Sequence, residues 1–448
     1  MIGAGSSGIA SCQVLQARGI GFDCFEKGSG VGGNWRYDND NGMSSAYRSL
    51  FINTSREMME YAAYPMPADY PDYPHHAQIA AYFDDYVDHF GLRDRIRFNT
   101  EVTSVEPTDD GRWEVTTDGG ESQAYEAVLV ANGHHWNPKY PEPPFPGQHT
   151  FAGEQLHSHH YREPDERFEG RRVLVLGIGN SAVDIAVESS RHAERTYLAM
   201  RRSAHVIPKY MGGKPIDQIA PPWFSRLPFA FTRRLLARQL KQVQGTMESY
   251  GLQKPDHRIG EAHPTVSSDL LPRIGHGRIT PKPNIARIDG STVHFTDGTS
   301  AEVDTIVWCT GYRITFPFLS SEVMDTEGNH VPLFRRVVHP ERPGLYFIGL
   351  VQPLGAIMPV AELQSEWVAD VLEGRAALPD PVTMRREIAE EEAAMRRRYV
   401  ASTRHTIQVD FHPYMRLLRA ERRRTQGVRR PLGAGSSARA ATGAPQAA

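Results

Sequence analysis

Short apolar runs and amphipathic stretches alternate along this chain, and the alternation starts twice at a glycine-rich turn. The first turn, Gly3-Ala4-Gly5-Ser6-Ser7-Gly8, precedes a helix pattern over 9–18 and an apolar run over 21–26. The second turn, Gly177-Ile178-Gly179-Asn180-Ser181-Ala182, follows an apolar run over 172–176 and precedes a helix pattern and a further strand pattern over 183–200. This order predicts an α/β fold with two dinucleotide-binding, Rossmann-like domains.

The remaining periodic segments extend the same plan. Strand patterns and turn residues predict a hairpin at 101–105 and 113–117, a strand at 125–131, a hairpin at 286–299 that turns at Asp289-Gly290, and strands at 305–309 and 344–349. Helices are expected at 360–372 and from 381 onward, and the Gly-, Ala- and Ser-rich stretch 433–448 is expected to be disordered. Only Met1-Ile2 precede Gly3, so we expect the natural chain to start further upstream with a complete first strand.

These elements divide the chain into interleaved domains. We expect a first dinucleotide-binding domain at 1–150 and 315–380, a second one inserted into it at 151–211 and 272–314, an insertion at 212–271 and a helical C-terminal segment at 381–448. The insertion is the expected substrate-access region. Its aromatic residues suit either an apolar lining or ordinary packing, and they are Trp223, Phe224, Phe229 and Phe231.

Composition narrows the classes of protein. With 50 Lys+Arg against 53 Asp+Glu, the chain has no overall field that favours nucleic acid, and the basic stretch 396–430 is interpreted as a solvated helical face. Its three cysteines form no close pair, which argues against disulfides and a zinc site, and no metal site is predicted. No apolar run approaches the ~20 residues of a membrane span. We therefore expect a cytoplasmic protein whose oligomeric state stays open, a homo-oligomer included.

The first glycine loop has the residues of a dinucleotide site. Gly3, Gly5 and Gly8 allow a tight turn, close approach to a pyrophosphate and close packing of the following helix, whose N-terminus favours negative charge. Glu26 ends the next strand about twenty residues on, where a carboxylate accepts ribose hydroxyls and repels a 2'-phosphate. A glycine turn alone is common, but this combination predicts a site for FAD or NAD.

The strand that follows the second glycine loop ends in positive charge, whereas the strand after the first loop ends in an acid. Gly177 and Gly179 occupy the first two positions, and Ala182 occupies the third, a substitution that the fingerprint tolerates. The following strand ends at Arg201-Arg202, and guanidinium groups pair bidentately with phosphate, which suits the 2'-phosphate of NADP. Two solvated surface arginines are the alternative. One acid-ended and one arginine-ended site predict hydride transfer from NADPH to FAD.

Four separated segments, within a likeness that extends to about Leu417, resemble the flavin-containing monooxygenases, a family of class B flavoprotein monooxygenases. They are Gly32-Gly33-Asn34-Trp35-Arg36-Tyr37, Asn53-Thr54-Ser55-Arg56-Glu57-Met58, the stretch 151–161 and Cys309-Thr310-Gly311-Tyr312. The third fits the family fingerprint F-x-G-x-x-x-H-x-x-x-[FY] at Phe151, Gly153, His157 and Tyr161. This fingerprint is far more specific than either glycine loop.

The resemblance implies an N,N-dimethylaniline monooxygenase-like reaction. In it NADPH reduces FAD, O2 adds to form a C4a-hydroperoxyflavin, and a soft nucleophile such as an amine or a sulfide takes one oxygen atom. Asn53 matches the family's active-site asparagine, whose amide can hydrogen-bond without a titratable proton, and capping of a turn before Thr54-Ser55 is the alternative. His157 is expected to be a structural joint between the domains and not a metal ligand.

The same resemblance suggests individual cofactor contacts. Beyond the loop glycines and Glu26, FAD contacts are expected from Ser7, Lys27, Gly33, Trp35, Val102 and Gln364. Beyond the second loop's small residues and the two arginines, NADP contacts are expected from Asn180 and Ser181. Trp35 could instead be a core residue, and Gln364 an exposed helix position.

Three other functions compete with this one. Baeyer–Villiger monooxygenases, which oxidise ketones and aldehydes to esters, have a similar fingerprint that ends in Trp-Pro, whereas this chain has Tyr161-Arg162. That difference favours heteroatom oxidation. A disulfide reductase would need a redox cysteine pair beside the flavin. A non-catalytic NADP-binding protein would result if the short first strand prevented flavin binding, and such a protein would be colourless.

Overall fold

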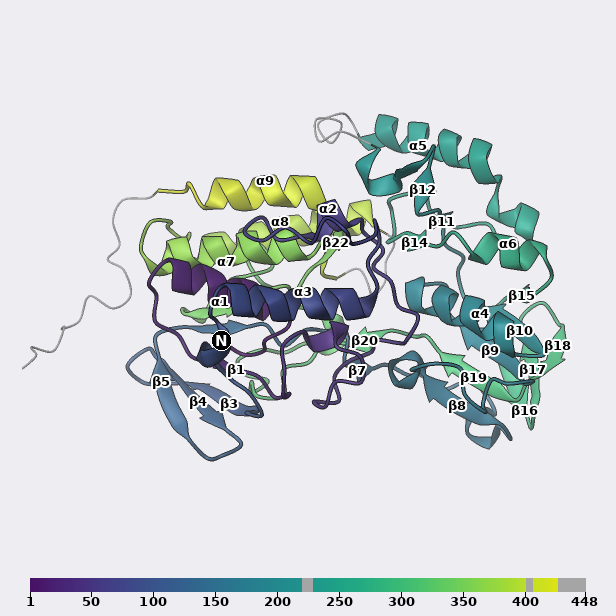
Figure 1. Ribbon diagram of the computed structural model, residues 1–448, viewed down its shortest axis with the longest axis horizontal. Coiled ribbons are helices and arrows are strands. Elements are labelled where there is room, and N and C mark those ends of the chain that lie inside the picture. The colour runs from purple at the N-terminus through teal and green to yellow at the C-terminus, as the bar shows by residue number, and fades with distance from the viewer. Residues whose placement is uncertain (220–228, 400–405, 426–448) are drawn as a thin grey trace, which may run out of the picture.

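The computed structural model describes residues 1–219, 229–399 and 406–425, which form two lobes side by side (Figure 1). The sheet of the first lobe combines short parallel strands from distant parts of the chain, namely β1 (Cys24–Phe25), β2 (Ile96–Arg97), β6 (Val128–Val130) and β21 (Leu345–Phe347). Ile2 lies between β1 and β6 and makes parallel bridges to Phe25 and Val130. The residue before the glycine loop therefore occupies the central position in the sheet that a first strand was expected to take.

Helices cover one face of this sheet, and a small antiparallel sheet covers the other (Figure 1). The helices are α1 (Ser6–Ala17), α2 (Arg56–Met59), α3 (His76–His89), α7 (Met358–Leu372), α8 (Pro381–Arg398) and α9 (Phe411–Glu421). The antiparallel strands are β3 (Val102–Pro107), β4 (Trp113–Thr117) and β5 (Ser122–Tyr125), so the first predicted hairpin is confirmed. Successive strand residues such as Cys24 and Phe25 belong to cores on opposite faces of the sheet, because side chains alternate along a strand.

The sheet of the second lobe consists of five parallel strands in the order β15-β10-β9-β19-β8. These strands are β8 (Glu154–His157), β9 (Arg172–Leu176), β10 (Arg195–Ala199), β15 (Ile279–Lys282) and β19 (Thr305–Trp308). Counted from β9, the order is the 3-2-1-4 of a Rossmann half. The predicted second hairpin is confirmed in an antiparallel sheet of β16 (Ile285–Asp289), β17 (Thr292–Phe295) and β18 (Ser300–Glu302). The fold class expected from the sequence is thus confirmed.

Several observed element boundaries differ from the predicted ones. Helix α4 (Asn180–His192) begins inside the glycine turn, three residues before the predicted start, because a helix can form as soon as the glycines have reversed the chain. The strand expected at 125–131 is confined to β6, since β5 ends at Tyr125. The helical stretch expected from residue 381 is interrupted by β23 (Gln408–Asp410), which pairs with β22 (Gln352–Leu354). The predicted disordered stretch 433–448 lies outside the described residues.

Residues 206–219 and 229–275, which include the described part of the insertion predicted at 212–271, form a layer over the second lobe and beside the first (Figure 1). We call these residues the insertion layer. Its elements are β11 (Val206–Ile207), β12 (Tyr210–Met211), β13 (Lys214–Pro215), α5 (Phe229–Gln244), β14 (Thr265–Val266) and α6 (Leu270–Gly275). Trp223 and Phe224 lie outside the described residues, as does the side chain of Phe229, while Phe231 is 58% exposed and does not line the cavity described below.

Short 3-10 helices and a two-stranded link complete the structure. The 3-10 helices are η1 (Gly33–Trp35), η2 (Arg93–Arg95), η3 (Gln148–Thr150), η4 (Ser158–His160), η5 (Ile216–Gln218), η7 (Met247–Tyr250) and η8 (Glu327–Asn329). The two chain crossings between the lobes pair as β7 (Asn137–Pro138) and β20 (Tyr312–Arg313). Lys139 N–H donates to the Gly311 carbonyl at 2.9 Å, so the two crossings are held together beside the cavity.

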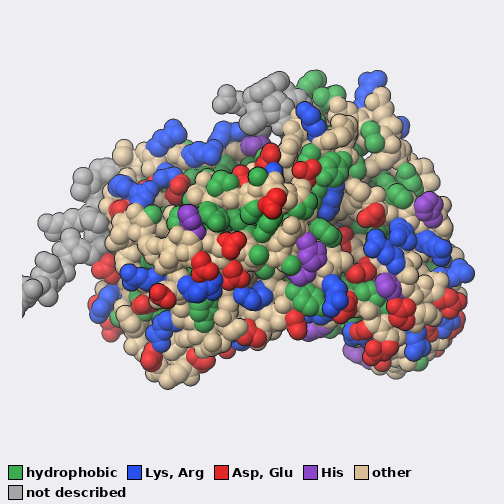
Figure 2. All heavy atoms as spheres, viewed as in Figure 1, with side chains coloured by type: hydrophobic (Ala, Val, Ile, Leu, Met, Phe, Trp, Pro, Cys, Tyr) green, Lys and Arg blue, Asp and Glu red, His purple; other side chains and the backbone are tan. Residues whose placement is uncertain are grey.

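Charged side chains of both signs are interspersed over the face seen in Figure 2, and hydrophobic side chains gather around the border between the lobes. Several arginines of the predicted basic stretch have acidic partners within the protein. Arg398 pairs with Asp410 at 2.9 Å, and Arg422 pairs with Asp370 at 2.6 Å. In the part of the chain that the structure describes, no helix is both long and apolar enough to cross a bilayer.

Candidate active site

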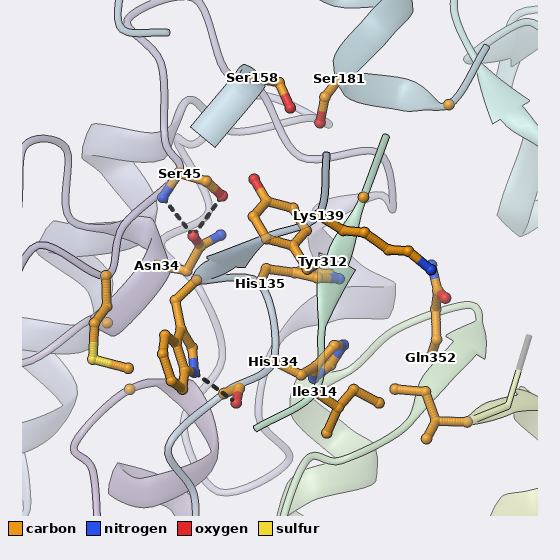
Figure 3. Close-up of a pocket in the computed structure, with 18 of the residues that line it drawn as sticks. Asn34, Ser45, His134, His135, Lys139, Ser158, Ser181, Tyr312, Ile314 and Gln352 are labelled. Carbon is orange, nitrogen blue, oxygen red and sulfur yellow. Dashed lines mark hydrogen bonds between the residues drawn. The ribbon is translucent and has the colours of Figure 1, made fainter. Parts of the chain in front are cut away.

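A cavity of about 1560 Å³ joins the two lobes and is lined by residues of both glycine loops. Its volume exceeds the ~300–1,000 Å³ of a site for one drug-sized ligand, so it has room for more than one such molecule. Asn34 and Ser45 come from the first lobe, Ser158 and Ser181 from the second, and Tyr312 from the link between them (Figure 3). The two loops therefore face a shared space and not two separate clefts.

The first glycine loop leaves the N-terminus of α1 open toward this cavity. Gly3 has a φ of +96°, and a Cβ on it would lie 2.7 Å from the carbonyl oxygen of Ala131. A Cβ on Gly8 would overlap the Gly3 carbonyl, so α1 packs against its own loop only because Gly8 lacks a side chain. No side chain caps α1 at Gly5, and the first N–H groups of a helix have no partner within the helix. This end can hold an anion.

Glu26 lies at the end of β1 and is 4% exposed, although it lines the cavity. Its carboxylate accepts hydrogen bonds from the Ala4 N–H at 2.7 Å, the Gly28 N–H at 2.8 Å and the Asn41 amide at 3.1 Å. These three bonds compensate for the burial of the charge. A carboxylate has about four lone-pair sites, so it can still accept a further donor from the cavity.

The other residues expected to contact FAD fall into two groups. Ser7, Lys27, Gly33, Trp35 and Val102 line the cavity, and Lys27 also pairs with Glu101 at 2.9 Å on its exposed rim. Gln364 does not line it. This side chain is fully buried, accepts from the Gly349 N–H at 2.8 Å and donates to the Tyr414 hydroxyl at 2.8 Å. Gln364 is therefore neither an exposed helix residue nor part of the cavity lining. It instead fixes the backbone of Gly349, which does line the cavity.

The second glycine loop presents the N-terminus of α4 in the same way. Gly179 begins this helix without a side-chain cap, and Ser181 points into the cavity (Figure 3). Ala182 is 1% exposed and packs in the core behind the loop, where a small residue is required. The Asn180 amide oxygen accepts from the Val266 N–H at 2.9 Å and so ties the loop to the insertion.

The two arginines after β10 differ in their surroundings. Arg201 lines the cavity, whereas Arg202 lies outside its lining and pairs with Asp256 at 3.3 Å. Both side chains are exposed. Arg201 is thus the one that faces the space beside the second loop.

Asn53 lies between the lobes on a segment without regular structure, residues 51–55, which precedes α2. It lines the cavity, and among the described residues none forms a hydrogen bond with its side chain. The alternative role as a turn cap is therefore not what this side chain does here; α2 has Ser55 at its N-cap position. The Asn53 amide is left available to whatever occupies the cavity.

The family fingerprint forms the edge strand of the second lobe and its continuation. Phe151 belongs to a core of that lobe, and a Cβ on Gly153 would overlap the Asp304 carbonyl. His157 is fully buried beside the rings of Tyr140 and Tyr312 at the link between the lobes, and burial lowers its pKa to about 4. Among the described residues there is no group of three or more candidate metal ligands. His157 thus packs against the link between the lobes.

Several contacts between the lobes involve residues that the sequence did not single out. The Tyr47 hydroxyl donates to Asp184 at 2.5 Å, and Ser49 donates to Glu188 at 2.7 Å. Tyr161, the fingerprint residue of the same lobe as Glu188, also donates to this carboxylate at 2.7 Å. Burial raises the pKa of Asp184 to about 6. Asp184 and Glu188 are four residues apart on α4, so one helix face holds the first lobe's segment ahead of Asn53. Only the helical spacing of the two acids hinted at this.

Two glycine loops that share one cavity in a two-lobed α/β fold are typical of flavoenzymes that bind two dinucleotides, a flavin and a nicotinamide. The family model for flavin-binding monooxygenase-like proteins matches residues 1–422. The chain belongs to this family, and the resemblance drawn from its motifs is confirmed. It is a flavin- and NADPH-dependent monooxygenase that acts on a small molecule and O2.

Named relatives agree with this membership. Flavin-containing monooxygenase 5 of Oryctolagus cuniculus is 40% identical over 428 residues, which cover 92% of this chain and 80% of the relative. Dimethylaniline monooxygenase [N-oxide-forming] 2 of Rattus norvegicus is 36% identical over 93% of this chain and 80% of its own. The solved structure of S-allyl-L-cysteine S-oxygenase from Allium sativum matches with a TM-score of 0.71 at 27% identity, over 95% of this chain and 88% of that one. An open structure of cyclohexanone monooxygenase, at 19% identity and a TM-score of 0.68 over 94% and 96% of the two chains, shares the fold.

Proposed function

We propose that this monooxygenase oxygenates soft nucleophilic heteroatoms, amine nitrogen and sulfide sulfur, of small organic substrates. The observation that carries the proposal is the shared cavity, which is lined by both glycine loops and by the unbonded amide of Asn53. Two relatives support the substrate class by name, one an N-oxide-forming enzyme and the other an S-oxygenase.

FAD fits the first lobe's side of the cavity. The open N-terminus of α1 suits its pyrophosphate, and Glu26 retains acceptor capacity for a ribose hydroxyl. Gly33, Trp35 and Val102 line the same side. In this proposal Gln364 acts on FAD only through the Gly349 backbone that it holds.

NADPH fits the second lobe's side. The N-terminus of α4, with Asn180 and Ser181 in its first turn, suits the pyrophosphate, and Arg201 suits the 2'-phosphate. Arg202 would add less to this positive charge, because it is paired with Asp256.

When bound and reduced by NADPH, the flavin supplies the activation of O2. The chain's own residues must then exclude water and withhold protons. Asn53 offers a hydrogen bond without a titratable proton. His134 and Tyr312 also line the cavity, and burial lowers the pKa of His134 well below its usual value and raises that of Tyr312. A neutral histidine and a protonated tyrosine are both poor acids at neutral pH.

The domain assignment is part of the proposal. Residues 1–150 and 315–380 would form the FAD domain, 151–211 and 272–314 the NADP domain, 212–271 the substrate-access insertion, and 381–448 the C-terminal segment. The free thiols of Cys12, Cys24 and Cys309 are compatible with the proposed cytoplasmic location.

Asn53→Ala tests the proposed role of Asn53. Because the variant lacks the amide, we expect product formed per NADPH to fall about tenfold and H2O2 release to rise, with FAD content and melting temperature unchanged. Asn53→Asp, of equal size but with a titratable proton, is expected to be uncoupled as well. Unchanged coupling in both variants would remove Asn53 from the mechanism.

Substrate class is tested on the wild-type protein with a tertiary amine, a thioether and a ketone. We expect N-oxide and sulfoxide to form with NADPH consumed in equal amount. An ester from the ketone, without N-oxide or sulfoxide, would replace this proposal with Baeyer–Villiger oxidation. A colourless protein that does not take up FAD would leave only NADP binding.

A further inference from the structure

The segment that carries Asn53 is held from outside its own lobe. The ammonium of Lys209, in the insertion layer just ahead of residue 212, donates to the carbonyl oxygen of Ile52 at 3.1 Å. On the other side of Asn53, the Ser55 N–H donates to the Asp217 carboxylate at 2.6 Å, and Gln218 donates to the Ser55 hydroxyl at 2.9 Å. Bonds from the insertion layer thus flank Asn53 one residue before it and two residues after it.

The Lys209 and Asp217 contacts are largely shielded from water. Ile52 is 1% exposed and Ser55 is fully buried. The Lys209 ammonium also lies 4.8 Å from the centre of the Tyr73 ring, and the Tyr73 hydroxyl donates to the Lys209 carbonyl at 2.6 Å. Hydrogen bonds to charged groups in such surroundings are the stronger kind. These bonds restrict the backbone on both sides of Asn53, whose own side chain has no hydrogen bond with the described residues.

The holding residues are themselves attached to the second glycine loop. β11 pairs with β14, and the Lys209 N–H donates to the Ser268 hydroxyl at 3.1 Å. At the start of β14, Thr265 donates to the Ile178 carbonyl, and the Val266 N–H donates to Asn180. The Ile216 N–H donates to the Lys209 carbonyl at 2.9 Å and so connects Lys209 with Asp217. A continuous chain of bonds therefore runs from the second glycine loop, through the insertion layer, to both sides of Asn53.

We propose that Lys209 and Asp217 are positioning residues that set the orientation of Asn53 in the cavity. The inference rests on the proposed function, since it gives Asn53 a catalytic role. It adds that the insertion layer, which includes the proposed substrate-access insertion, also fixes part of the active site of the first lobe. Neither residue lines the cavity, so both act through the Ile52 and Ser55 backbone.

Hydrogen exchange tests the hold itself, on the full FAD-loaded protein without substrate. Asp217→Ala removes the acceptor of the Ser55 N–H and is expected to speed exchange of residues 50–57 about tenfold or more, whereas Asp217→Asn keeps an acceptor and restores slow exchange. Lys209→Met is expected to act like Asp217→Ala, and Lys209→Arg to restore the wild-type rate. Lys214→Met, an exposed lysine in the neighbouring hairpin, is the matched control. Unchanged exchange in Asp217→Ala and Lys209→Met would overturn the proposal.

Turnover then tests the consequence. In Asp217→Ala we expect less product per NADPH and more H2O2, with the FAD content and the KM for NADPH of the wild type. The double variant Asn53→Ala/Asp217→Ala should be no more uncoupled than Asn53→Ala, because Asp217 acts through Asn53. Multiplying losses would show that Asp217 acts elsewhere and would overturn the proposal. Full coupling in Asn53→Ala would instead refute the catalytic role of Asn53, and the exchange rates would still decide whether the insertion layer holds its segment.

Discussion

The strand after the first glycine loop ends in a buried carboxylate with three hydrogen bonds, whereas the strand after the second ends in two exposed guanidinium groups. The helices differ in the same sense. α1 carries no charged residue and packs against α7, whereas α4 carries Asp184 and Glu188, which bind the other lobe. Two copies of one motif thus differ, since one helix is a fixed part of a core whereas the other also binds the neighbouring lobe.

The largest effect is expected at Glu26. Glu26→Ala leaves three donors without their acceptor, at a cost of about 1–3 kcal/mol for each buried group, and removes the acceptor proposed for the ribose. We expect purified protein to hold less than about a tenth of the wild-type FAD, read from the ratio of visible to ultraviolet absorbance. Glu101→Gln, on the exposed rim of the same region, is the control. Retention of FAD by Glu26→Ala would show that the two strand ends differ in structure but not in ligand binding.

An intermediate effect is expected at the arginines. If Arg201 contacts the 2'-phosphate, Arg201→Ala loses a charged hydrogen bond, and the KM for NADPH should rise about 10- to 100-fold while the KM for NADH stays the same. Arg202→Ala should change it only about two- to fivefold, because this guanidinium is already paired with Asp256 at the surface. Steady-state kinetics with both nucleotides measures this. Equal effects in the two variants would contradict the distinction between them.

The smallest effect is expected at Asp184, and it depends on pH. Burial raises the pKa of Asp184 from 3.8 to about 6, and the nearby Glu188 and Asp269 raise it as well. The hydrogen bond from Tyr47 and the charge of Lys209 lower this pKa but do not offset the effect of burial. The folded state therefore binds the proton more tightly than the unfolded state, so this contribution to stability is present below pH 3.8 and is lost as the pH rises through about 6. Asp184→Asn should flatten the free energy of unfolding across that window in urea titrations. An unchanged slope would mean that Asp184 titrates normally.

Much of the fold and part of the candidate site are predictable from local sequence. Glycines at fixed spacing, an apolar strand before the second loop and a charged residue after each following strand describe units of about 30 residues, within which chain geometry leaves few arrangements. The strand at 172–176, both hairpins and the order of the two nucleotide units therefore follow from the local sequence. The acid at Glu26 and the arginine at Arg201 were found for the same reason.

Tertiary structure alone decided what surrounds Asn53 and Gln364. The bond between Ser55 and Asp217 joins residues 162 positions apart, and the bond between Lys209 and Ile52 spans 157. Hydrophobic periodicity predicts whether a residue is buried, but not which distant residue it contacts. Neither contact can therefore be predicted from the local sequence. The same holds for Gln364, for which the family resemblance implied a flavin contact and whose side chain bonds with Gly349 and Tyr414 in the structure. The chain's local chemistry determined which ligands this protein suits. The packing of the insertion layer against the first lobe determined how the backbone on both sides of Asn53 is held, because those hydrogen bonds form only after distant segments come together.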